Sequence, residues 1–138
     1  MGRQLALDTS VLVAAERSQI RPEGLLLPDD DIGIPMIVLA EFKGGIACAD
    51  EQYQPRMRRF LDGFLELAQV LPYDDAVLER HAKLIAWTVH HGVARGQNDL
   101  VVAATAAATG RTIMTLDKHA HFDDLPGVSA ITIDLPPR

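Results

Sequence analysis

Four acidic side chains, spread along the chain, could together bind a metal ion. They are Asp8, Glu41, Asp99 and Asp117. Carboxylates held ~4 Å apart repel by about 4 kcal/mol per pair at an effective dielectric constant of 20. A hard divalent cation such as Mg²⁺ or Mn²⁺ offsets that repulsion because it takes oxygen ligands. Such an ion activates water and stabilises an in-line displacement at phosphorus.

The segment that follows Gly96 shows how one of these acids would be held. Gln97 and Asn98 can cap a helix, and an Ala-rich run of small and aliphatic side chains follows as far as Ala108. A helix that is apolar on all sides should be buried. Asp99 would then lie in the first turn of a core helix, where the helix dipole favours an anion.

The rest of the chain predicts an α/β fold with a parallel sheet. We expect strands at 3–8, 31–35, 70–72, 112–117 and 130–133, and helices at 11–16, 36–45, 50–69, 74–91 and 97–108. Largely apolar strands that alternate with helices are typical of a parallel sheet covered on both faces. Ligands bind beyond the carboxyl ends of such strands, and Asp8 and Asp117 each stand at the end of one.

Each acid also has a plainer interpretation when it is taken alone. Asp8 fits ordinary turn chemistry, and Asp99 could merely cap its helix. Glu41 interrupts an apolar run and asks for a partner, but it could also lie on an exposed stripe and pair with nothing.

The fourth acid has an alternative position. Asp123 or Asp124 could replace Asp117, although neither directly follows a predicted strand.

Composition describes one globular domain over residues 1–138, with 48% hydrophobic and 23% charged residues. The formal net charge of −6 argues against binding nucleic acid through a broad basic face, but it is compatible with a cluster of metal-binding acids. The single cysteine, Cys48, indicates a reducing cytoplasm, and we expect it to be a small buried hydrophobe. No targeting or membrane-spanning segment is visible in the sequence.

Other hydrolytic chemistries lack their residues. The sequence has no G-x-S-x-G motif, no glycine-rich phosphate cradle and no evident histidine partner for Cys48. A phosphatase of the haloacid-dehalogenase type needs a second aspartate two residues after the first, where Ser10 stands after Asp8. A receiver domain needs an acidic pair beside its phosphate acceptor, and that pair is missing near Asp8.

Four short motifs, in this order, resemble the acidic motifs of PIN-domain ribonucleases, most closely the VapC toxins of bacterial toxin–antitoxin pairs. They are Asp8-Thr9-Ser10-Val11-Leu12, Leu39-Ala40-Glu41-Phe42, Gly96-Gln97-Asn98-Asp99-Leu100-Val101-Val102-Ala103-Ala104 and Thr115-Leu116-Asp117. The resemblance covers essentially the whole chain. It implies a three-layer α/β/α PIN-like sandwich with a central parallel sheet of four or five strands.

The resemblance also implies an activity and a set of roles. The four acids would bind Mg²⁺ or Mn²⁺ and position the water that hydrolyses an RNA phosphodiester bond. Ser10 would support the water network of the metal, and Asn98 would orient its neighbours. A homodimer and a cognate VapB-like antitoxin that plugs the acidic groove are the implied partners. Arg95 is our candidate for an RNA phosphate contact, and a non-catalytic PIN-like module that binds RNA or protein is the alternative function.

Overall fold

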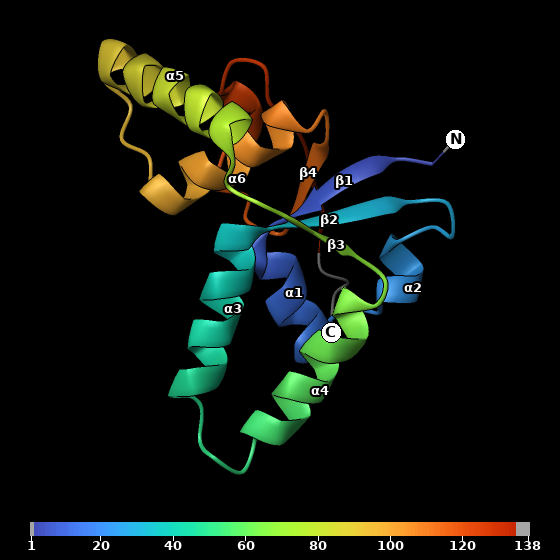
Figure 1. The fold of residues 1–138 in the computed structure, drawn as a ribbon. Coiled ribbons are helices and arrows are strands. Elements are labelled where there is room, and N and C mark those ends of the chain that lie inside the picture. The colour runs from blue at the N-terminus through green and yellow to red at the C-terminus, as the bar shows by residue number, and fades with distance from the viewer. Residues whose placement is uncertain (1, 135–138) are drawn as a thin grey trace.

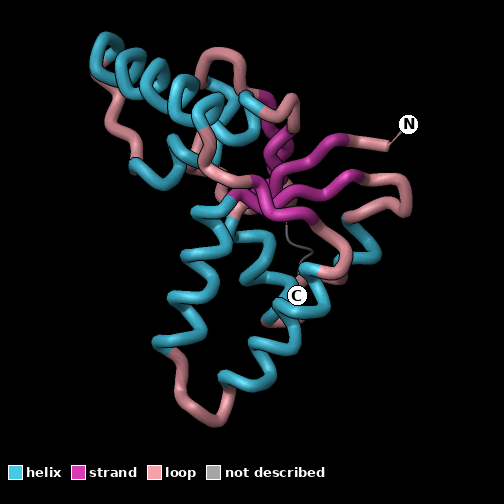
Figure 2. Tube along the Cα trace, in the orientation of Figure 1, coloured by secondary structure: helices cyan, strands magenta, loops and turns pink. Residues whose placement is uncertain are grey.

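The computed structural model describes residues 2–134, and its centre is a parallel sheet of five strands (Figures 1 and 2). The strands are β1 (Gln4–Leu7), β2 (Asp31–Pro35), β3 (Gln69–Leu71), β4 (Thr112–Thr115) and β5 (Ser129–Thr132). They lie in the order β3-β2-β1-β4-β5 and every neighbouring pair is parallel. The α/β class and the predicted parallel sheet are therefore confirmed.

The strand order reverses between β1 and β4. The chain adds β2 and β3 on one side of β1 and then crosses to add β4 and β5 on the other side. A reversal of this kind leaves a crevice beyond the carboxyl ends of the two central strands, which is where open α/β sheets bind ligands. Asp8 directly follows β1, and Asp117 lies two residues after the end of β4.

Helices cover both faces of the sheet and complete the predicted three layers. In Figure 1 the first four helices lie on one side and the last two on the other. They are α1 (Thr9–Glu16), α2 (Pro22–Leu25), α3 (Met36–Cys48), α4 (Gln54–Leu65), α5 (Asp75–His91) and α6 (Gln97–Ala108). Among the described residues, none of these helices has the length and apolar character needed to cross a lipid bilayer.

Helix α6 is deeply packed beyond its first turn, as its composition predicts. Leu100 and the residues from Val102 to Ala106 are buried. Small side chains allow close approach, and the one polar member, Thr105, donates its hydroxyl hydrogen to the carbonyl oxygen of Val101 at 2.7 Å. A buried polar group that is paired in this way costs little free energy.

Three expectations from the sequence were wrong in detail. The helix predicted at 50–69 is shorter, because a turn occupies 51–53 and α4 begins at Gln54 with a proline in its first turn. Helix α2 was not expected at all. Cys48 is exposed rather than buried, because α3 extends past the expected end at residue 45 and carries Cys48 as its last residue.

The amino edge of the sheet is held by a buried arginine. Arg111 precedes β4, and its guanidinium donates to the carbonyl oxygens of Leu5 at 3.1 Å and Asp31 at 2.9 Å. It also forms an ion pair with the Asp31 carboxylate at 3.0 Å. One side chain thereby links β1, β2 and β4 at the edge opposite the acidic residues.

Replacing this arginine should destabilise the fold. Arg111→Met removes the guanidinium and leaves the Leu5 and Asp31 oxygens without their donor, so we expect the free energy of unfolding to fall by about 2–4 kcal/mol. Urea unfolding at neutral pH measures this loss. The matched control is Arg58→Met on α4, where the only described side-chain hydrogen bond is to Gln54 and a change within about 0.5 kcal/mol is expected. Equal effects of the two substitutions would contradict this role.

Candidate active site

Asp8 is the best-held acid of the proposed site. Its residue is only 8% exposed, and it occupies the N-cap position of α1 directly after β1. One carboxylate oxygen accepts from the backbone N–H of Thr9 at 2.8 Å. The other accepts from the hydroxyl of Thr115 at 2.7 Å and from that of Ser10 at 3.2 Å. Asp8 therefore does cap its helix, but both of its oxygens are also fixed at the reversal point of the sheet.

Two hydroxyl groups connect Asp8 to the end of β4. The backbone N–H of Leu116 donates to Ser10 Oγ at 3.0 Å, and that of Asp117 donates to Thr115 Oγ1 at 3.0 Å. The two hydroxyl oxygens are 3.3 Å apart. Ser10, which the family resemblance assigns to the water network of the metal, thus contacts Asp8 in this structure. Sequence reasoning missed Thr115, although its position two residues before Asp117 in a predicted strand was the available signal.

Glu41 is exposed on α3 and is tied to α1. The hydroxyl of Thr9 donates to its Oε1 atom at 2.9 Å. The interpretation that Glu41 lies on an exposed stripe is correct about its exposure. The expectation that Glu41 pairs with nothing is wrong, because it accepts this hydrogen bond from Thr9. Thr9 was also missed as a site residue. Its contact with Glu41 cannot be inferred from the local sequence, since the two residues are 32 positions apart in the chain.

Asp99 lies in the first turn of α6, and the N-cap position of this helix is not held by either residue that the sequence predicted there. The N-cap residue is Gly96, and among the described residues no side chain donates or accepts a hydrogen bond that caps this helix. Gln97 and Asn98 are helical residues rather than caps, so that prediction is wrong. Asn98 is exposed. Because Asp99 is not the N-cap residue, capping does not explain why an acid stands there.

The surroundings of Asp99 disfavour its negative charge. Burial is the largest cause that raises the pKa of Asp99 above its usual range. The charges of Asp8, Asp117 and Glu41 raise the pKa further, in that order, while Arg95 lowers it. The three acids singled out in the sequence are thus the acids whose charges act on Asp99. Neither Asp123 nor Asp124 acts in this way, which favours Asp117 as the fourth acid.

Arg95 and Asp124 belong to the margin of this cluster. The Arg95 side chain is 10% exposed, and its guanidinium donates to the carbonyl oxygen of Ala120. It also lies 3.7 Å from a carboxylate oxygen of Asp124. The Nε atom of Arg95 is buried without a described partner. Contact with an RNA phosphate would therefore require this side chain to turn away from Asp124.

The donor set fits a hard cation bound partly through water. Within residues 2–134, no three histidine, cysteine or acidic side chains are close enough to form a ready-made ligand shell. Mg²⁺ does not need such a shell, because it keeps several waters and is held by one or two carboxylates. The donors are all oxygens, and the excess negative charge around Asp99 is the charge that a divalent cation would neutralise.

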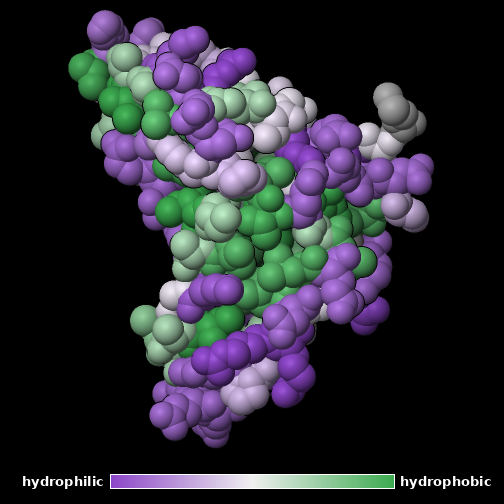
Figure 3. Space-filling model, in the orientation of Figure 1, coloured by the Kyte–Doolittle hydropathy of each residue, from purple (hydrophilic) through white to green (hydrophobic). Residues whose placement is uncertain are grey.

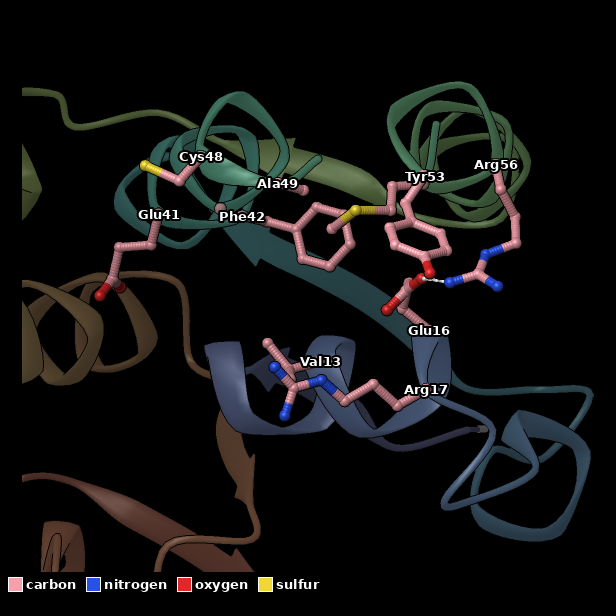
Figure 4. Close-up of a pocket in the computed structure, with 11 residues that line it drawn as sticks. Val13, Glu16, Arg17, Glu41, Phe42, Cys48, Ala49, Tyr53 and Arg56 are labelled. Carbon is pink, nitrogen blue, oxygen red and sulfur yellow. Dashed lines mark hydrogen bonds and ion pairs between the residues drawn. The ribbon is translucent and has the colours of Figure 1, made fainter. Parts of the chain in front are cut away.

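A groove runs from this cluster between α1, α3 and α4, with a volume of about 410 Å³ (Figure 4). Glu41 lies at one end of it, and an ion pair between Glu16 and Arg56, 3.4 Å long, lies at the other. Phe42 and Tyr53 line the part between these ends. The groove therefore offers an apolar floor with charged groups at both ends.

The family of the chain follows from comparison with known proteins. Residues 5–128 match the model of the PIN domain. Over 132 residues the chain is 30% identical to Ribonuclease VapC of Rickettsia bellii, which covers 95% of this chain and 97% of that protein. It is 29% identical over 128 residues to Ribonuclease VapC5 of Mycobacterium tuberculosis, covering 92% of this chain and 91% of that protein. The chain belongs to the PIN-domain family, and its relatives are VapC ribonucleases, as the four acidic motifs predict.

Solved structures confirm the fold. The structure of VapBC2 from Rickettsia felis, bound to a DNA fragment from its promoter, matches with a TM-score of 0.85 at 24% identity and covers 95% of this chain and 99% of that chain. VapBC-5 from Mycobacterium tuberculosis, a member of the VapBC family of toxin–antitoxin systems, matches with a TM-score of 0.76 at 26% identity, covering 94% and 98%.

Neutralising Asp99 should stabilise the metal-free protein. Because the pKa of Asp99 is raised in the folded state, its ionisation opposes folding, and this penalty grows as the pH rises through that pKa. Asp99→Asn should therefore melt a few degrees higher than wild type in EDTA at neutral pH, and the difference should vanish in acid. Added Mg²⁺ should stabilise wild type more than the variant.

Thermal unfolding followed by circular dichroism from acid to neutral pH measures both effects. The control Asp123→Asn lies in a short 3₁₀ helix, and its charge does not act on Asp99. If Asp99→Asn melts like wild type with and without Mg²⁺, the carboxylates do not share one electrostatic site.

Proposed function

We propose that the protein is a metal-dependent endoribonuclease of the VapC kind, which hydrolyses RNA phosphodiester bonds and is inhibited by a cognate VapB-like antitoxin. The observation that carries the proposal is the meeting of acids from separate elements beyond the carboxyl ends of β1 and β4. The hydroxyl of Thr115 contacts the Asp8 carboxylate and the backbone N–H of Asp117, and the charges of Asp8, Asp117 and Glu41 all reach Asp99. Membership of the PIN-domain family supports the same reading.

The four acids would hold the ion, Mg²⁺ or Mn²⁺, which when bound activates water and stabilises the charge that develops at phosphorus. Asp8 would be the fixed member, because hydrogen bonds to both of its oxygens restrict its rotation. Asp99 would make the binding of a cation favourable, because burial and three neighbouring acids oppose its ionisation when no cation is bound. Ser10 would support this arrangement through Asp8, and Asn98, which is exposed beside Asp99, would orient its neighbours.

Arg95 remains our candidate for an RNA phosphate contact. Its guanidinium lies close enough to Asp99 to lower the pKa of that acid, and its ion pair with Asp124 is long at 3.7 Å. A phosphate has two advantages over Asp124, since it offers more acceptor oxygens and would also use the unpartnered Nε atom. An RNA substrate and a single cysteine both fit a cytoplasmic site of action.

The antitoxin would dock along the groove between α1, α3 and α4. The groove begins at Glu41, so a segment lying in it would reach the acidic cluster. Its apolar floor suits hydrophobic side chains, and the acids at its end suit a basic side chain. We also propose that the protein is a homodimer, as the family resemblance implies.

Cleavage of RNA should require both the metal and Asp8. We expect purified, antitoxin-free protein to cut total cellular RNA into discrete fragments with Mn²⁺ or Mg²⁺ and not with EDTA. Asp8→Asn should lower the rate at least about 100-fold, because the acid nearest the reversal of the strands is lost. Asp62→Asn on the exposed side of α4 is the matched control and should cleave like wild type. No cleavage by folded, partner-free protein would instead indicate a catalytically silent PIN-like binding module.

The hydroxyl of Thr115 should matter without touching substrate. Thr115→Val keeps the shape of the side chain but removes its hydrogen bonds to Asp8 and to the N–H of Asp117. We expect cleavage to fall about 10–100-fold and the Mn²⁺ concentration for half-maximal activity to rise, as is typical when a group supporting metal ligands is lost. Thr112→Val, at the other end of β4, is the control. The role of Thr115 would be disproved by equal activity of the two variants.

A further inference from the structure

An exposed tyrosine lies at the same edge of the sheet as the acidic cluster. Tyr73 follows two residues after β3 ends at Leu71, and 45% of the residue is exposed. Met36, which directly follows β2, is also 45% exposed, and its neighbour Pro35 pairs with Leu71 across the two strands. Figure 3 shows apolar side chains at the surface in the middle of the view, where Figure 1 places β3 and the segment that leads from it to α5. The carboxyl edge of the sheet therefore has an apolar flank beside its acids.

Hydrogen bonds hold this tyrosine in one orientation. The Tyr73 hydroxyl lies 2.8 Å from His81 Nδ1, and His81 Nε2 lies 3.2 Å from the side-chain oxygen of Gln97. Because that oxygen can only accept, His81 donates from Nε2, and a neutral His81 accepts from the Tyr73 hydroxyl at Nδ1. The rings of Tyr73 and His81 are perpendicular, with an interplanar angle of 89°. We call Tyr73, His81 and Gln97 the Tyr73 platform.

The Tyr73 platform reaches the element that carries Asp99. Gln97 is the first residue of α6 and Asp99 is the third, so both lie within the first turn of this helix. Arg95, the candidate for a phosphate contact, precedes Gln97 by two residues. A substrate that contacts Asp99 and Arg95 therefore passes beside the platform.

The faces of the Tyr73 ring are the part of the platform that can bind a ligand. His81 contacts the ring at its hydroxyl end and so does not cover these faces. An exposed aromatic ring is the side chain on which single-stranded RNA stacks, because an unpaired base offers a flat face of its own. Since the ring of Tyr73 is already oriented, stacking on it costs little conformational entropy.

Charge gives a reason for binding a base at this edge. The chain has a formal net charge of −6, and the acids that act on Asp99 repel phosphate groups until a cation binds. Stacking between a base and an aromatic ring is not opposed by this repulsion, because neither group carries a net charge. Contacts with bases can therefore hold RNA beside a cluster of acids that disfavours its backbone.

From the place of Tyr73, its fixed orientation and the charge around it, we propose that the Tyr73 platform binds an unpaired nucleobase of the RNA substrate. Tyr73 stacks on the base, and His81 and Gln97 are positioning residues that hold the ring. The inference rests on the proposed function, because it identifies the RNA bound beside the acids as single-stranded. Binding and cleavage can be measured separately, so the failure of one is distinguished from the failure of the other.

The test is the binding of fluorescently labelled single-stranded oligoadenylate to the full-length, antitoxin-free protein in EDTA, followed by fluorescence anisotropy. The proposed nuclease is inactive without a metal, so binding is measured apart from cleavage. Tyr73→Ala should raise the Kd about 5- to 100-fold, which is the loss expected for one stacked base. Tyr73→Phe keeps the ring and should stay within about threefold of wild type. Leu27→Ala is the control, because Leu27 is 59% exposed and precedes the amino end of β2.

A strand of the same length with abasic sugars separates contacts with bases from contacts with phosphates. Wild type, Tyr73→Ala and His81→Ala should all bind this strand equally. His81→Ala should weaken the binding of oligoadenylate about threefold, because the ring of Tyr73 is no longer held. With Mn²⁺, Tyr73→Ala should raise the KM for cleavage of RNA and leave kcat nearly unchanged, because the base stays stacked in the transition state.

Three results would overturn the proposal. They are equal affinity of wild type and Tyr73→Ala for oligoadenylate, an equal loss of affinity in Leu27→Ala, and a loss in Tyr73→Ala that is as large for the abasic strand. Cleavage of RNA by Tyr73→Ala with the KM of wild type would also overturn it, and would leave the nuclease standing. Binding that depends on Tyr73 and on bases, in a protein that cleaves no RNA, would support the platform and contradict the nuclease.

Discussion

Repulsion among carboxylates beyond the ends of β1 and β4 is the constraint on which the rest of this structure depends. The reversal of strand order leaves Asp8 and Asp117 side by side, and α3 and α6 bring Glu41 and Asp99 to the same place. Although Asp8 caps α1, like charges in a partly buried site cost free energy, and the raised pKa of Asp99 reflects this cost. A costly cluster that the fold holds rigidly is the mark of a functional site rather than a structural one.

Hydrogen bonds and packing around the acids hold them in place despite this electrostatic repulsion. The hydroxyls of Thr115 and Ser10 fix Asp8 to β4, and at the opposite edge Arg111 binds three strands together. Helix α6 is packed with small side chains, so Asp99 at its start has little freedom to move away from the other acids. The edge of the sheet that carries the acids is therefore held by hydroxyl groups and by apolar packing, rather than by contacts between the acids.

Much of this could be predicted from the sequence, because the fold and the acids both leave local signals. Apolar strands ending at Asp8 and near Asp117 and the Ala-rich run after Asp99 identify the parallel sheet and the edge where the acids meet. What could not be predicted depends on contacts between distant residues. The hydrogen bond from Thr9 to Glu41 and that from Thr115 to Asp8 are visible only once the strands are paired. The true cap of α6, Gly96, and the exposure of Cys48 depend on where helices begin and end, which local pattern determines least well.

The central claim is that Asp8, Glu41, Asp99 and Asp117 form one site for divalent cations, and crystals of the antitoxin-free protein grown with Mn²⁺ test it most directly. An anomalous difference map identifies manganese without any assumption about activity. We predict a manganese peak beyond the carboxyl ends of β1 and β4, bound through Asp8 and its acidic neighbours and in part through water. A map with no peak there at saturating Mn²⁺, or with its peak at Asp123 and Asp124 instead, would contradict the account.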